Sequence, residues 1–168
     1  MRILKAIGVL FIVILLGFVY GIFHNQISYS ISSEVFTQLF FDQFGFVEYG
    51  TDTPRLTAGI IGVWSTLYLS LILGFLYFLL ILIFNPNWKF IKKGIIIHLF
   101  SAFVISILGL IYGYFNVISL KFMKLDNFHQ IKEPTEFSMA IWMHNFSYYG
   151  GIIGLILAFA YILKNRNN

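Results

Sequence analysis

The chain has 168 residues, of which 59% are hydrophobic, 20% aromatic and only 11% charged. Soluble domains carry about 25% charged residues, so this composition argues against a water-soluble globule. The chain has no cysteine, which excludes disulfides, thiolate metal sites, iron–sulfur clusters and cysteine nucleophiles. We therefore expect an integral membrane protein whose chemistry depends on other side chains.

Charged residues occur in a few short segments and leave uncharged runs at residues 6–33, 56–88, 94–120 and 137–163. A membrane helix needs about 20 mostly apolar residues, and a charge at its centre costs roughly 2.5–3.5 kcal/mol. Each run is long enough to span a membrane. The sequence therefore predicts a single transmembrane domain over residues 1–168, with helices near 4–23, 57–84, 94–116 and 137–163. The first run begins like a signal peptide, but it is longer and lacks a small-residue cleavage site, which favours an uncleaved helix.

Basic residues are unevenly divided between the two sides that four spans would create. One side would hold no acids and seven basic residues, which are Arg2, Lys5, Lys89, Lys92, Lys93, Lys164 and Arg166. The other side would hold every Asp and Glu, together with Arg55, Lys121, Lys124 and Lys132. Lysine and arginine favour the cytoplasmic side, so we expect both termini in the cytoplasm. Membrane topology then explains the basic excess, and no nucleic-acid partner is expected.

Each predicted helix carries small residues at spacings of three or four, as in the series Ala58, Gly62, Thr66, Ser70 and Gly74. Membrane helices associate through close backbone approach at such faces. We therefore predict an all-α fold, a compact four-helix antiparallel bundle. The faces leave open whether some of them also serve a homo-oligomer or a partner in a membrane complex.

Residues 24–56 are too apolar for a free loop, and we expect this structured segment to lie on the outer membrane surface and cover the bundle. Apolar residues alternate with serine from Ile27 to Ser32, a period-two pattern. The next stretch, from Ser33 to Phe41, fits one or two amphipathic helical turns with Ser32 or Ser33 as the N-cap.

Three of the four histidines and all the acids fall in the outer half of the expected topology. A neutral imidazole and a carboxylate suit zinc, iron, manganese or copper, so His24, Glu34 and His144 are candidate metal ligands. Ionisable groups in membrane helices are functional candidates by default. The groups expected to converge under the outer segment are His24, Asn25, Gln26, Glu34, His129, His144, Asn145 and Tyr148.

Each of these residues also has a structural alternative. His144 lies among small residues and would hydrogen-bond a neighbouring helix, an interaction worth about 0.6 kcal/mol on average in membrane proteins. His24 would lie at the interface or cap a helix, and Glu34 would favour a helix N-terminus. His98, near the cytoplasmic end of its helix, is expected to have a structural role in helix packing. A structural cluster, a metal or haem site, and a proton or small-ligand site all remain open.

Known classes of small four-helix membrane protein test these alternatives. A quinone-linked disulfide oxidase needs cysteine pairs, and a lipoprotein signal peptidase needs an aspartate dyad, whereas every aspartate here lies outside the predicted helices. A small multidrug transporter needs a glutamate within a span, and no span has one. A di-haem cytochrome needs histidine pairs near both sides, but the inner side offers only His98. A single outer haem between His24 and His144 stays open.

Three short elements resemble those of a small bacterial four-helix membrane-protein family. The family has an H-[DN]-Q element after its first helix, then E-[YV]-F-T, and H-N-x-S-Y early in its last helix. The matching elements are His24-Asn25-Gln26, Glu34-Val35-Phe36-Thr37 and His144-Asn145-Phe146-Ser147-Tyr148. The resemblance implies a fold and a compartment but no reaction. It also singles out, as the preferred functional set, His24, Gln26, Glu34, Thr37, His144, Asn145 and Tyr148.

Three functions remain as expectations. The first is a small integral membrane protein with a polar site at the outer side of the bundle. The second is a membrane enzyme or electron carrier that binds a transition metal or a single haem. The third is a transporter or a subunit of a larger membrane complex. The abundance of Ile, Phe, Asn and Lys indicates an AT-rich genome and favours a bacterial inner membrane.

Overall fold

The computed structural model describes residues 1–118 and 131–166, and these ranges are helical apart from short links. Four long helices dominate: α1 (Arg2–Ile31), α4 (Pro54–Phe84), α5 (Trp88–Phe115) and α6 (Pro134–Asn165). Each is long and apolar enough to cross a membrane. The predicted all-α fold with four spans is thereby confirmed at the level of helix number, length and composition.

The chain between α1 and α4 forms three short helices, which are the π-helix η1 (Phe36–Phe40), α2 (Phe41–Gln43) and α3 (Val47–Asp52). The residues with the period-two pattern, which begins at Ile27, do not form an extended strand, because α1 continues to Ile31. Serines fit this helix because Ser30 donates its hydroxyl back to the carbonyl of Gln26, as serine commonly does one turn along a helix. The helical turns expected after this pattern begin at Glu34, and the backbone carbonyl of Ser33 accepts the N–H groups of Phe36 and Thr37, so Ser33 stands at the expected N-cap position.

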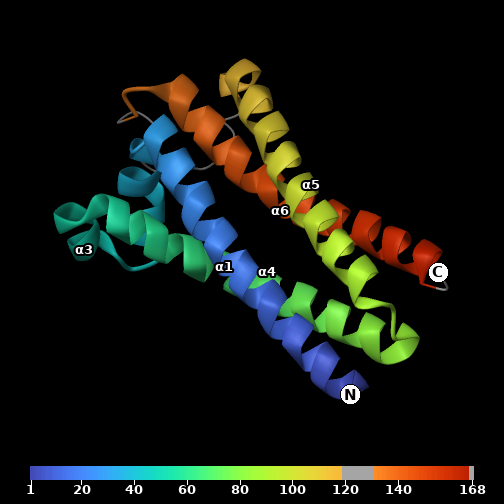
Figure 1. Cartoon of the computed structure of the whole chain (residues 1–168). Coiled ribbons are helices and arrows are strands. Elements are labelled where there is room, and N and C mark those ends of the chain that lie inside the picture. The colour runs from blue at the N-terminus through green and yellow to red at the C-terminus, as the bar shows by residue number, and fades with distance from the viewer. Residues whose placement is uncertain (119–130, 167–168) are drawn as a thin grey trace.

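The four helices pack as two antiparallel pairs, α1 with α4 and α5 with α6, and the pairs cross each other (Figure 1). Within the first pair the backbones touch where Gly21 meets Gly62, because a Cβ on either glycine would overlap the carbonyl of the other. Gly17 likewise faces Ser70 on α4. The predicted small-residue faces thus serve contacts within this pair.

The second pair is held in the same way. A Cβ added at Gly109 or Gly113 of α5 would overlap the backbone of α6, and one at Gly154 of α6 would overlap His98 on α5. Between the pairs, contact runs mainly along α1 and α6. The bundle is therefore made of two tight pairs with a looser junction.

Two apolar clusters lie at opposite ends of the junction. The basic-end cluster joins all four long helices and consists of Ala6, Val9, Val13, Leu73, Tyr77, Leu80, Ile81, Ile91, Ile95, Leu155, Ala158 and Ile162. The acidic-end cluster packs the segment after α1 onto α4 and α6, and consists of Val35, Phe36, Phe40, Phe41, Ala58, Ile61, Phe137, Ala140 and Ile141.

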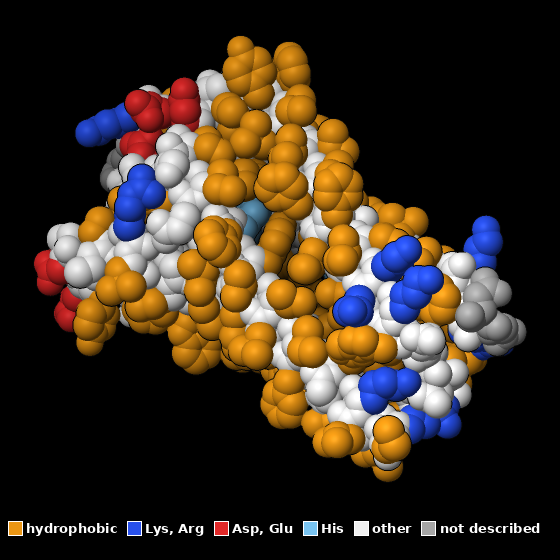
Figure 2. All heavy atoms as spheres, viewed as in Figure 1, with side chains coloured by type: hydrophobic (Ala, Val, Ile, Leu, Met, Phe, Trp, Pro, Cys, Tyr) orange, Lys and Arg blue, Asp and Glu red, His pale blue; other side chains and the backbone are white. Residues whose placement is uncertain are grey.

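We name the two ends of the molecule by their charged side chains, which are basic at one end and mainly acidic at the other. Arg2 donates to the carbonyls of Ile81 and Ile83, and Lys5 donates to Asn85 and to the carbonyl of Pro86. These cations stabilise the C-terminus of α4, where the helix dipole is negative. Asn85 ends α4 in the left-handed conformation (φ 45°). Acidic side chains gather at the opposite end of the molecule, and a broad apolar surface separates the two ends (Figure 2).

Candidate functional site

Two histidines from different helix pairs meet near the acidic end. The ring of His24 on α1 lies 5.6 Å from the ring of His144 on α6, measured between centroids. Only 5% of His24 and 8% of His144 is exposed. Tyr20 stacks on His24 at 5.5 Å, and Phe40 from η1 packs against His144 at 4.9 Å. The structure therefore brings two of the candidate ligands into ring contact in the buried interior.

Tyr148 links His144 to the other helix pair. Its hydroxyl lies 3.3 Å from the carbonyl of Ser65 on α4 and 3.0 Å from Nε2 of His144. When the single hydroxyl proton is donated to Ser65, the oxygen accepts from the ring nitrogen. In that arrangement a neutral His144 carries its N–H on Nε2 and a lone pair on Nδ1.

One ring nitrogen of each histidine, Nδ1 of His144 and Nε2 of His24, is buried without a hydrogen-bond partner among the described residues. Most buried polar side-chain atoms in proteins are satisfied, so such exceptions call for an explanation. Three more unsatisfied oxygens lie on Asn25 and Ser28 of α1 and on Ser32, the residue that follows the helix.

Glu34 performs a different task from the one expected of a metal ligand. Its carboxylate accepts the backbone N–H groups of Lys132 at 3.0 and 3.2 Å and of Glu133 at 2.9 Å. These groups immediately precede Pro134, the first residue of α6. A carboxylate at a helix N-terminus is stabilising, so Glu34 ties the segment after α1 to the start of α6. Among the described residues, no group of three His, Cys, Asp or Glu side chains is placed to hold a metal ion.

The remaining predicted residues divide by location. Asn25 donates to the carbonyl of Ala58 at 3.0 Å, and Gln26 donates to that of Arg55 at 2.8 Å, so both join α1 to α4. Thr37 is exposed on η1, whereas the two histidines are buried. His129 lies outside the described residues.

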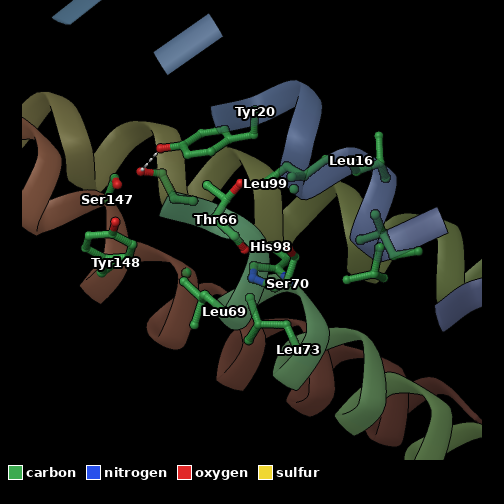
Figure 3. A pocket seen from close by; sticks show the side chains of 15 residues that line it. Leu16, Tyr20, Thr66, Leu69, Ser70, Leu73, His98, Leu99, Ser147 and Tyr148 are labelled. Carbon is green, nitrogen blue, oxygen red and sulfur yellow. Dashed lines mark hydrogen bonds between the residues drawn. The ribbon is translucent and has the colours of Figure 1, made fainter. Parts of the chain in front are cut away.

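A central cavity of about 60 Å³ lies between the helix pairs. All four long helices contribute to its wall (Figure 3). A water molecule needs about 10–15 Å³ of such volume, so the cavity has room for about four. Its polar lining is supplied by Tyr20, Thr66, Ser70, His98, Ser147 and Tyr148.

Most of this polar lining was not singled out from the sequence. Thr66, Ser70 and Ser147 each donate to a carbonyl of their own helix, which leaves hydroxyl lone pairs free to accept from water. Nδ1 of His98 lies 3.4 Å from the hydroxyl of Tyr77. The signal in the sequence was the presence of hydroxyls on the small-residue faces, which was interpreted as packing alone.

A second cavity, of about 260 Å³, opens at the acidic end, and we call it the acidic-end cleft. It is lined by Leu39, Phe40, Gln43, Phe44, Ile141, His144, Asn145 and Tyr148. Tyr148 lines both this cleft and the central cavity. Tyr148, whose hydroxyl contacts His144 and the carbonyl of Ser65, is therefore the residue through which the two spaces could communicate, together with its neighbours in the wall.

A haem does not fit the histidine pair. A bis-histidine haem would need a flat slab of space between the imidazoles, wide enough for a porphyrin. Instead, the rings of Tyr20 and Phe40 pack directly on His24 and His144. The packing suits a ligand no larger than a few atoms.

Comparisons with known proteins add no name to this site. No family model, curated protein or solved structure matches the chain. The likeness to a small bacterial membrane-protein family therefore rests on the three short elements described above.

Proposed function

We propose that the protein is an integral protein of a bacterial inner membrane, with both termini on the cytoplasmic side. The basic end gathers the N-terminus, the α4–α5 link and, through Arg166 over the ring of Phe84, the C-terminus. Its charged residues are all basic. Because Lys and Arg favour the cytoplasmic side of a membrane, the acidic end then faces outward.

Within this frame we propose that the protein conducts protons, through the junction between its two helix pairs. One observation carries the proposal: Tyr148 lines both the acidic-end cleft and the central cavity, and its hydroxyl is already hydrogen-bonded to His144. A proton taken up by His144 from the cleft would release the ring's Nε2 proton to the hydroxyl of Tyr148, as that hydroxyl turns from the Ser65 carbonyl and gives its own proton to water in the central cavity. His98, at the cavity wall beside Tyr77, is the next acceptor.

The lining favours protons over larger ions. Neither cavity has a lysine, arginine, aspartate or glutamate among its described lining residues. A bare ion within the membrane would carry a large desolvation cost without a counter-charge. Protons move instead along imidazoles, hydroxyls and water, which are the groups present here.

The basic end closes the path in this structure. Below His98, the basic-end cluster fills the junction with side chains such as Leu80, Ile91 and Ile162. Since the tight contacts lie within each pair and not between pairs, a small rocking of one pair against the other would open this end. Rigid-body rocking of helix groups around a fixed site is common in membrane transporters.

Proton flux into proteoliposomes tests the proposal. Vesicles containing the protein and a trapped pH dye would be given a potassium diffusion potential with valinomycin. We expect acidification above that of protein-free vesicles, and a loss of at least about tenfold in the Tyr148→Phe variant. Tyr149→Phe is the matched control, because Tyr149 is 57% exposed and lines neither cavity. Flux equal to that of empty vesicles, or equal in both variants, would overturn the proposal.

A further inference from the structure

We infer that His24 and His144 form a two-imidazole binding site for a monovalent soft metal ion, of the class of Cu(I) or Ag(I). The inference goes beyond proton conduction and does not depend on it. It begins from two buried ring nitrogens, Nε2 of His24 and Nδ1 of His144, that have no partner among the described residues. The rings stand 5.6 Å apart between centroids, which is close enough for one small ion to contact both.

His144 is prepared as a ligand. Its Nε2 lies 3.0 Å from the hydroxyl of Tyr148, and it donates its N–H there when Tyr148 donates to the carbonyl of Ser65. Metal-binding histidines usually donate their second N–H to such a partner, which fixes the ring and makes the free nitrogen more basic. The lone pair on Nδ1 is therefore oriented by a chain that reaches across to the other helix pair.

No carboxylate of the described residues joins the two histidines in a metal-binding group, and this selects the charge of the ion. Glu34, the expected third ligand, is held by the N–H groups of Lys132 and Glu133. Two neutral imidazoles leave the full charge of the ion in a buried site, and the cost of burying charge rises steeply with its magnitude. Zinc also prefers four ligands in a closed site. A monovalent ion that accepts two ligands meets both conditions.

The surroundings suit a cation of this kind. The faces and edges of Tyr20 and Phe40 pack on the two imidazoles, and aromatic rings attract cations that have lost their water. Phe40 and His144 also line the acidic-end cleft, so the site is adjacent to an open space. An ion arriving at the acidic end would reach His144 without crossing the apolar surface.

Silver binding to the full-length protein in detergent tests the inference. Ag(I) is redox-inert, and the chain has no cysteine to compete for it. After desalting in a thiol-free nitrate buffer, elemental analysis should find one equivalent of silver per chain. This equivalent should be lost in His24→Gln and in His144→Gln, and retained in His98→Gln, a buried histidine on α5. Silver retained in both of the first two variants would overturn the inference, as would equal retention of zinc by the wild type.

A second measurement does not depend on variants that fold poorly. X-ray absorption at the copper edge of the wild-type protein loaded with Cu(I) should show two nitrogen neighbours at about 2 Å, as for imidazole–metal bonds in general. A shell with sulfur from any of the 4 methionines, or with more than two ligands, would overturn the two-imidazole site.

Discussion

The hydroxyl of Tyr148 lies 3.0 Å from Nε2 of His144, one turn earlier on α6. If the hydroxyl proton is donated to the carbonyl of Ser65, 3.3 Å away, this contact puts the N–H of a neutral His144 on Nε2. It also fixes a side chain that lines two cavities and links the two helix pairs. A single contact thus underlies both the proposed proton path and the proposed metal site.

The tautomer of His144 is directly measurable. In protein labelled with ¹⁵N-histidine, we expect the neutral Nε2–H form at His144. Tyr148→Phe removes the acceptor for that N–H, so the variant should show a mixture of the two tautomers. An unchanged His144 spectrum in Tyr148→Phe would contradict the assignment. Tyr149→Phe should leave the His144 signals as they are in the wild type.

The contact between Gly21 and Gly62 predicts strong sensitivity to a single methyl group. Gly62→Ala would place a Cβ against the carbonyl of Gly21, and such overpacking typically costs about 1–3 kcal/mol. The midpoint of thermal unfolding in detergent should fall. Gly8→Ala is the control, because a Cβ at Gly8 meets nothing within 4 Å. A Gly62→Ala midpoint no lower than that of Gly8→Ala would argue against the crossing.

Glu34 should behave as a cap of α6. Glu34→Ala removes the acceptor for the N–H groups of Lys132 and Glu133, a loss of about 0.5–2 kcal/mol by analogy with N-caps. Hydrogen exchange of the backbone at residues 132–137 should become faster. Replacement of Glu48, an exposed acid on α3, should leave exchange at these residues unchanged. If both variants exchange alike at 132–137, Glu34 does not hold the start of α6.

The membrane orientation can be tested without background, because the chain has no cysteine. Asp52→Cys at the end of α3 and Lys92→Cys in the first turns of α5 place single thiols at exposed positions of opposite ends. A membrane-impermeant maleimide added to intact cells whose outer membrane is permeable to it should label the first and spare the second. Labelling of Lys92→Cys but not of Asp52→Cys in intact cells would show that the orientation is the opposite of the one proposed.

Only part of the candidate site could be predicted from the sequence. His24, His144 and Tyr148 were singled out and lie together, whereas Glu34, grouped with them as a ligand, binds the N-terminus of α6, in line with its structural alternative at a helix N-terminus. Its partners are backbone N–H groups, which every residue except proline has, so no side-chain pattern marks them. The hydroxyl lining around Tyr20 and Thr66 was missed for a related reason: small polar residues serve packing and solvation equally well.

The sequence by itself determined the four spans, the small-residue faces and the separation of basic from acidic segments. These properties depend on local hydrophobicity, helical spacing and charge, which follow from the order of residues along the chain. Only the tertiary structure decided that the helices pack as two pairs, that Tyr148 lines two cavities, and that the rings of His24 and His144 lie against each other. Those relationships depend on where helices cross and how each is rotated about its axis. Contacts such as Gly21 against Gly62 fix the crossing and rotation, and they exist only when both helices are in place.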